Sequence, residues 1–328
     1  MVKVHIGVDI SKDWIDFATF DQTLMKSSFT QRVENKGTSI RSFLKKLIKD
    51  HALIHVVFEH TGAYGLVLEK ELTRLGITYS VVPAYEIKMS LGIRRGKSDV
   101  IDAMRIAEYA AINDYKLKPS KMRPESILKI KELLAYRSQL RKVCSSFKNS
   151  LKAHSLMIKE TGLNSIVSDI KKQIQAFEKK IKDIESQIHE IVQTNKDLNT
   201  NYQLLLSIKG VGKLIAYYML VVTDNFTRFN DPRKFNCYSG LAPFEHTSGS
   251  SVRGKTMTQS LANKMMKTII RNGVNSAIMY DPQLKTYYKR KTEEGKSKNI
   301  VKNAVACKLV YRMFAVIKRQ SPFILLAN

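Results

Sequence analysis

The stretch KVHIGVDISK, from Lys3 to Lys12, decides the fold of the first part of the chain. Its short apolar run over 4–8 predicts a β-strand, and Asp9 follows this run directly. A strand that ends in an acid places the carboxylate at the carboxyl edge of a sheet. Glu59 stands in the same position after the apolar run 54–58 in HVVFEHTGAY. Both acids are therefore expected at such an edge.

The rest of the first hundred residues alternates strand and helix patterns. Further strands are predicted over 14–20, 54–58 and 77–82, and helices over 39–48 and 65–75. Gly76 closes the second of these helices as a C-cap. The pattern predicts an α/β domain, with a mixed sheet and helices on its faces.

Two more acids, Asp99 and Asp102, fall three apart in KSDVIDAMRIAEY and would share one face of a helix. Together with Asp9 and Glu59 they predict a site for Mg²⁺ or Mn²⁺, the ions that such oxygen ligands suit. Two ions about 4 Å apart would support in-line displacement at phosphorus. The alternative interpretation, which stays open on these residues alone, is that Asp99 caps a helix and the other acids make surface contacts.

The charge balance indicates a polyanionic partner. Of the 328 residues, 55 are Lys or Arg and 29 are Asp or Glu, which gives a net charge of +26. Such a field favours nucleic acid or an anionic membrane surface. The chain lacks a long apolar run and an apolar N-terminal segment, so nucleic acid is the expected partner, without membrane attachment, and a cytoplasmic location is expected. The three cysteines have no metal-binding spacing and predict free thiols.

The middle of the chain predicts long helices. Apolar residues repeat at heptad spacing around charged ones and form one seam: Val167, Ile170, Ile174, Phe177, Ile181, Ile184, Ile188 and Ile191. A break is expected at Thr161-Gly162. An antiparallel hairpin within one chain and pairing between chains both satisfy the seam.

Two motifs in the last third carry candidate nucleic-acid contacts. KGVGK resembles the helix-hairpin-helix turn of DNA-binding proteins, and its candidate contacts are Lys209, Gly210, Gly212 and Lys213. A simple turn between helices is the alternative. The serine- and glycine-rich stretch 239–255 offers Arg253 and Lys255 to a phosphate. A serine there would act as a nucleophile only when a base or metal activates it, and His246 is a candidate base. A flexible polar loop is the alternative.

These motifs together resemble the insertion-sequence transposases of the IS110 type, described as bridge-RNA-guided recombinases, with pilin-gene DNA invertases as relatives. HIGVDISK, FEHTGAY and KSDVIDAMRIAEY match the family's N-terminal DEDD domain, which is RuvC-like, that is, RNase H-like in fold. SIKGVGKLIA and FTRFNDPRKFNCYSGLAPFEHTSGSSVRGK match its C-terminal transposase domain. The resemblance implies three parts: a DEDD metal-binding domain over 1–123, a helical coiled coil over 124–199 and a mostly helical transposase domain over 200–328.

The resemblance also implies the roles of single residues. Asp9, Glu59, Asp99 and Asp102 match the catalytic DEDD metal-binding tetrad. Ser248 matches the catalytic serine, which would attack a DNA phosphodiester and form a phosphoserine link. Ser239 ranks second because the family does not require it. The chain departs from the family at Ala262, where a glycine is expected.

The implied partners are DNA, a structured guide (bridge) RNA and further copies of the chain in a dimer or tetramer. The expected activity is that of a DNA transposase or site-specific recombinase. One alternative is a RuvC-like, metal-dependent nuclease that cuts branched DNA with activated water. Others are a recombinase that inverts DNA and a nucleic-acid-binding scaffold with an inactive metal site.

Overall fold

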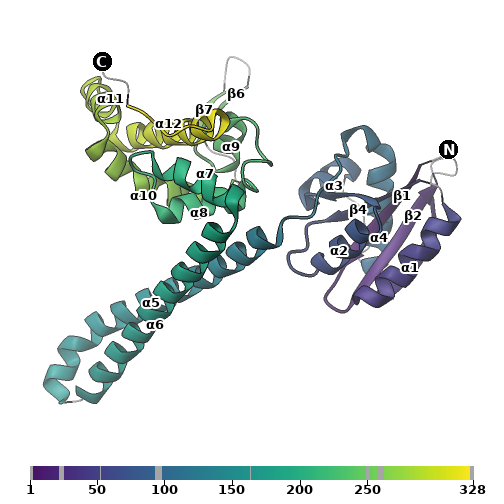
Figure 1. Ribbon diagram of the computed structural model, residues 1–328, viewed down its shortest axis with the longest axis horizontal. Helices are drawn as coiled ribbons and strands as arrows, with labels where there is room; N and C mark the ends of the chain where they lie inside the picture. Colours follow the sequence, from purple (N-terminus) through teal and green to yellow (C-terminus); the bar gives the residue numbers. More distant parts are fainter. Residues whose placement is uncertain are drawn as a thin grey trace. The chain divides into compact units, whose positions relative to one another are not determined.

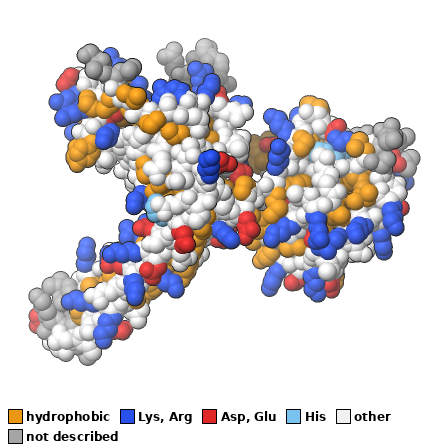
Figure 2. All heavy atoms as spheres, viewed as in Figure 1, with side chains coloured by type: hydrophobic (Ala, Val, Ile, Leu, Met, Phe, Trp, Pro, Cys, Tyr) orange, Lys and Arg blue, Asp and Glu red, His pale blue; other side chains and the backbone are white. Residues whose placement is uncertain are grey.

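The structure is a computed structural model, and it describes residues 3–21, 26–51, 53–92, 98–162, 164–248, 252–257 and 262–325. Its internal contacts divide the chain into two compact units, 1–122 and 123–328, which are described separately. Within the described residues, none of the helices has the length and apolar character needed to cross a membrane. Figure 2 shows Lys and Arg side chains over both units.

The first unit is built on a five-stranded mixed sheet with the order β3-β2-β1-β4-β5. Strands β1 (Val4–Ile10), β2 (Trp14–Asp21) and β3 (Lys26–Glu34) are antiparallel neighbours. Strands β4 (Ile54–Glu59) and β5 (Thr78–Val82) continue the sheet parallel to β1. The expected RNase H-like mixed sheet is confirmed (Figure 1). Strand β3 was not predicted, because its sequence KSSFTQRVE has few apolar residues for an alternating pattern.

Helices cover both faces of this sheet. The helices α1 (Gly37–Asp50) and α2 (Leu66–Arg74) bury Ile40, Leu44 and Leu72 in one core with Ile6 and Val8 of β1. The opposite face carries α3 (Ala84–Leu91) and α4 (Asp99–Ile112), which is followed by the short 3-10 helix η1 (Asp114–Lys116). Alternation along β1 therefore sends its even-numbered residues towards α1 and α2, and its odd-numbered residues towards α4.

Gly7 allows α4 to lie directly on β1. A Cβ at this position would lie 2.1 Å from the Ala107 nitrogen and 2.4 Å from the Ala103 oxygen. The small side chains of Ala18, Ala103 and Ala107 are fully buried around this contact. The close approach brings the first turn of α4 over one end of β1 and η1 over the other end.

The second unit is helical apart from one β-hairpin. Its helices are α5 (Glu125–Thr161), α6 (Asn164–Thr194), α7 (Lys196–Leu206), α8 (Lys213–Val222), α9 (Pro232–Tyr238), α10 (Lys264–Tyr280), α11 (Pro282–Glu293) and α12 (Lys298–Arg319). The strands β6 (Phe244–Ser248) and β7 (Val252–Met257) pair antiparallel. This β-hairpin overlaps the stretch 239–255, for which a flexible polar loop was the alternative interpretation.

Helices α5 and α6 form an antiparallel pair, one of the two arrangements that satisfy the seam, and Gly162 lies at the predicted break (Figure 1). The seam residues Ile174, Ile181, Ile184 and Ile188 are buried. Packing within one chain accounts for these buried residues, while pairing between chains stays a prediction. The paired helices α5 and α6 share one hydrophobic core with the later helices. The division of the chain into three parts, with a separate coiled coil over 124–199, therefore stays a prediction.

Candidate active site

Two of the predicted acids lie at the carboxyl ends of neighbouring parallel strands. Strand β1 pairs with β4 up to Val8 and Phe58, so Asp9 and Glu59 follow at the next position of each strand. Both side chains are half-buried. Parallel pairing of β1 with β4 is what unites two acids that are fifty residues apart in the sequence.

The other two predicted acids occupy the first turn of α4. Ser98 caps this helix, because its hydroxyl oxygen accepts a hydrogen bond from the Ile101 nitrogen at 3.3 Å. Asp99 is thus not the cap that the alternative interpretation required. Acids in the first turn are stabilised by the helix dipole, and here they face the end of β1.

The ionisation of Asp9 shows that the four acids are close together. The pKa of Asp9 is raised to about 6, first by burial and then by the negative charges of Glu59, Asp102, Asp99 and Asp16. The four predicted acids therefore lie close together, and Asp16, which was not predicted, joins them. We call the five residues the acidic cluster.

Asp16 was not predicted as a site residue. The structure places it directly opposite Asp9, because β1 and β2 pair in this register. Arg32 lies opposite Asp16 on β3 and donates two hydrogen bonds to its carboxylate, at 2.9 and 2.8 Å. Arg32 also donates to Asp99 at 3.2 Å, so it joins the sheet to α4. The sequence signal that could have identified Asp16 is an acid inside the mostly apolar strand pattern 14–20. In the structure this side chain is only 3% exposed.

The donor atoms of the acidic cluster fit a hard divalent cation. All are carboxylate oxygens, and the pKa of Asp9 is raised first by burial and then by the negative charges of its neighbours, which a cation would neutralise. Asp99 and Asp102 are held by Arg32 and Arg105 at 3.2 and 3.1 Å. Among the described residues, no three of these acids place oxygens within 4.8 Å of one another. Binding an ion would therefore require side-chain rotation away from the arginines.

The predicted nucleophile lies in the second unit. Ser248 ends β6, and its backbone pairs with Val252 of β7. The side chains of Ser248, His246, Arg253 and Lys255 lie outside the described part of the chain, as does all of Gly249. Ser239, which ranked second, is completely buried and donates its hydroxyl to the Asn236 oxygen at 3.3 Å.

KGVGK forms the turn between α7 and α8. Gly210 has a φ of +93° and packs on α10, where a Cβ would lie 2.6 Å from the Ala277 Cβ. This glycine therefore has a packing role in addition to any contact with nucleic acid. Lys209, Gly212 and Lys213 are exposed, and Gly212 is the N-cap of α8.

Comparisons with known proteins match both units. A transposase family model of the IS110 DEDD type matches residues 6–157, and the model of the transposase IS116/IS110/IS902 family matches 202–289. A pilin gene-inverting protein of Moraxella lacunata is 27% identical over 98% of both chains. A probable family 20 transposase of Pseudomonas aeruginosa is 21% identical over 97% of both. Among solved structures, T. thermophilus RuvC with a Holliday junction substrate aligns at 12% identity and a TM-score of 0.29, covering 36% of this chain and all of RuvC.

Proposed function

We propose that this chain, which belongs to the IS110/IS116 family of transposases, cuts and rejoins DNA through Ser248 with the help of the tetrad Asp9, Glu59, Asp99 and Asp102. The observation that carries the proposal is the placement of the acids: Asp9 and Glu59 end neighbouring parallel strands, and the first turn of α4 carries Asp99 and Asp102 to them. Such a concentration of acids in a chain of net charge +26 suits a metal ion placed between protein and phosphate.

In the proposed reaction, the Ser248 oxygen attacks a DNA phosphorus atom. A bond forms between this oxygen and phosphorus, the bond from phosphorus to the departing strand breaks, and the departing oxygen takes a proton to leave as a hydroxyl. The serine proton passes to a base, for which His246 is the candidate. Rejoining reverses the step: a hydroxyl from another strand attacks the phosphoserine and releases the serine.

The tetrad would hold Mg²⁺ or Mn²⁺, which supplies positive charge to the phosphate oxygens when bound. Arg32 and Arg105 keep Asp99 and Asp102 paired when these acids are not bound to an ion. In the second unit, Lys209, Lys213, Arg253 and Lys255, with the backbone at Gly210 and Gly212, are proposed to bind DNA or RNA phosphates.

A structured guide RNA and a dimer or tetramer complete the proposal. Base pairing would then select the DNA, while the protein reads backbone and shape, as in other RNA-guided systems. Joining four DNA ends requires more than one active site, which supports an oligomer. The proposed location is the bacterial nucleoid. Sequencing the RNA that co-purifies with the full chain tests the guide: one discrete structured species is expected, and random fragments alone would refute it.

The serine mechanism is tested with Ser248→Ala and a plasmid that carries the DNA flanking the gene. The wild-type chain, purified with its RNA, should form a covalent protein–DNA adduct that survives denaturation. Ser248→Ala should form none, while the neighbouring control Ser251→Ala should keep it. An adduct formed by Ser248→Ala would rule out this nucleophile. Asp9→Asn and Asp102→Asn should lower strand exchange at least about 100-fold, with DNA binding retained.

The alternative is a metal-dependent nuclease that uses activated water. One observation favours it: the acidic cluster forms within the first unit alone, without Ser248. Cleavage of branched DNA to free ends, with no attached protein and no effect of Ser248→Ala, would support this alternative. Inversion of DNA is the second alternative, favoured by the near full-length similarity to the Moraxella pilin gene-inverting protein. A plasmid reporter with inverted and direct sites would distinguish inversion from transposition.

A further inference from the structure

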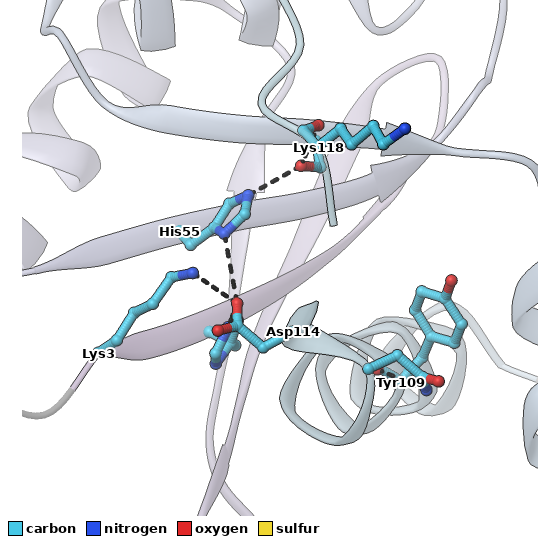
Figure 3. Close-up of polar contacts among 8 residues, drawn as sticks. Lys3, His55, Tyr109, Asp114 and Lys118 are labelled. Carbon is cyan, nitrogen blue, oxygen red and sulfur yellow. Dashed lines mark hydrogen bonds and ion pairs between the residues drawn. The ribbon is translucent and has the colours of Figure 1, made fainter. Parts of the chain in front are cut away.

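A second group of potential ligands lies on the same sheet face as the acidic cluster, at the other end of β1. His5 and His55 are register partners on β1 and β4, and Asp114 begins η1, just beyond α4. One ligand atom from each lies within 4.8 Å of the others. Asp9 lies four positions after His5 on β1, about 13 Å along the strand, so the two groups are distinct. Figure 3 shows Asp114 below His55, with Lys3 beside it.

The hydrogen bonds around His55 assign its tautomer. The Ser80 hydroxyl donates to the Lys118 carbonyl oxygen at 2.7 Å, so the Ser80 oxygen accepts from His55 Nε2 at 2.8 Å. The proton is then on Nε2, and the Nδ1 lone pair points to the side of Asp114 (Figure 3). Histidines that bind metals are commonly oriented in this way, with the second ring nitrogen donating to a neighbouring group.

This arrangement places two acceptors face to face without a proton between them. His55 Nδ1 lies 4.0 Å from Asp114 Oδ1, and it is buried with no hydrogen-bond partner. His55 is 2% exposed, so water does not readily satisfy this nitrogen. An unpaired buried lone pair opposite a carboxylate is a position that suits a cation.

The distances suit a tetrahedral transition-metal ion. In the metal-free protein His5 Nε2 forms a hydrogen bond with Asp114 Oδ1 at 2.8 Å, which a bound metal would replace, and His55 Nδ1 lies 4.0 Å from the same oxygen. Ligands about 2.0–2.1 Å from Zn²⁺ at tetrahedral angles are about 3.3 Å apart, which lies between these two values. Two imidazole nitrogens with one carboxylate form a ligand set that suits Zn²⁺, whereas Mg²⁺ prefers oxygen ligands alone.

We propose that His5, His55 and Asp114 form a second metal site, which binds Zn²⁺ or a similar divalent transition ion and is separate from the acidic cluster. Binding ties β1, β4 and η1 together. The proton that His5 Nε2 donates to the Asp114 carboxylate in the metal-free protein moves to Nδ1 of the same ring when Nε2 becomes a ligand. This site does not depend on Ser248 or on the proposed recombinase activity.

Lys3 is the group that competes with the metal. Its ammonium pairs with Asp114 Oδ1, the oxygen that the ion would use. Lys3 directly precedes β1 and its side chain is 32% exposed, so it has room to move into solvent. Zn²⁺ therefore has to displace the Lys3 ammonium from Asp114 Oδ1 before it can bind this oxygen. Removing the ammonium should strengthen Zn²⁺ binding.

Calorimetric titration of the full chain with Zn²⁺ in excess Mg²⁺ tests the site, since Mg²⁺ occupies the acidic cluster. A site with a stoichiometry of one is expected in the wild-type chain and in Ser248→Ala. His5→Gln and Asp114→Asn should weaken Zn²⁺ binding more than about 100-fold, and Ser80→Ala about 10- to 100-fold. Lys3→Met should strengthen it. The control His51→Gln, at the C-cap of α1, should leave it unchanged.

Nitrogen NMR of the histidine rings provides a second readout that does not depend on stability. Zn²⁺ should shift Nε2 of His5 and Nδ1 of His55, while Nε2 of His55 stays protonated. Equal Zn²⁺ affinity in the wild-type chain, His5→Gln and Asp114→Asn, or no shift of the His5 and His55 nitrogens, would overturn the proposal. Loss of adduct formation in Ser248→Ala with Zn²⁺ binding intact would show that the two proposals stand separately.

Discussion

At the scale of single residues, Asp9 is a carboxyl group whose ionisation its neighbours oppose. Arg32 donates hydrogen bonds to Asp16 and Asp99, and its charge also acts on Asp9, but burial and the four neighbouring acids still raise the pKa of Asp9. A folded pKa of about 6, against 3.8 for the free side chain, means that the folded protein holds the Asp9 proton more tightly than the unfolded chain does. This contribution to stability is present at low pH and is lost as the pH rises through 6.

Asp9→Asn should therefore stabilise the metal-free protein at pH 7.5. The expected gain in the free energy of unfolding is about 1–2 kcal/mol, because one pKa unit corresponds to about 1.4 kcal/mol and water screens part of the repulsion. The gain should disappear near pH 4, and added Mg²⁺ should stabilise the wild-type chain more than the variant. Denaturant unfolding at both pH values measures this. Asp13→Asn, an exposed acid in the same unit, is the control. A destabilised Asp9→Asn at pH 7.5 would contradict the electrostatic account.

At the scale of elements, the contact between α4 and β1 positions both candidate sites. The first turn of α4 carries Asp99 and Asp102 to Asp9, and η1, which follows α4, carries Asp114 to His5. The backbones approach closely because position 7 has no side chain. A single packing contact thus controls the geometry of two groups of ligands at opposite ends of one helix.

Gly7→Ala should separate α4 from the sheet. The added Cβ would meet backbone atoms at 2.1 and 2.4 Å, so a destabilisation of about 2–4 kcal/mol is expected from overpacking. The pKa of Asp9, followed by NMR, should fall towards its ordinary value as the acids move apart. Gly212→Ala, where no atom lies within 4 Å of the added Cβ, is the control. Unchanged stability in Gly7→Ala would show that this contact does not position α4.

The elements also show which parts of the structure local patterns predict. The strands β1, β2, β4 and β5 and the long helices α5 and α6 follow from apolar periodicity, because the burial of each depends on its own repeat. Strand β3 and the hairpin of β6 and β7 do not. They are rich in polar residues, and their pairing partners define them as strands.

At the scale of the whole molecule, positive charge is spread over both units, and the net value is +26 (Figure 2). Binding to DNA should therefore weaken steeply with salt. On duplex DNA each neutralised phosphate contributes about −0.9 to the slope of log affinity against log salt concentration. Lys209 and Lys213, exposed at the turn between α7 and α8, are proposed to provide two of these contacts.

The double variant Lys209→Ala/Lys213→Ala should make this slope less steep by about 2. Fluorescence anisotropy with a labelled duplex over a range of salt concentrations measures the change. The matched control is Lys171→Ala/Lys172→Ala, which removes the same charge from exposed positions on α6. Equal slopes for the two double variants would mean that the turn makes no specific phosphate contact.

From the sequence alone, Asp9, Glu59, Asp99 and Asp102 could be predicted as candidate metal ligands, since each acid follows a strand pattern or lies at the start of a helix pattern. The apolar repeat over 167–191 is local in the chain, so it predicted a long helix, but it left pairing within one chain or between chains open. Only the tertiary structure decided that Asp16 and Arg32 join the acids, and that Asp114 meets His5 and His55. Those neighbours depend on strand register and on how closely α4 packs on Gly7, and both are contacts between residues distant in sequence that no local pattern encodes.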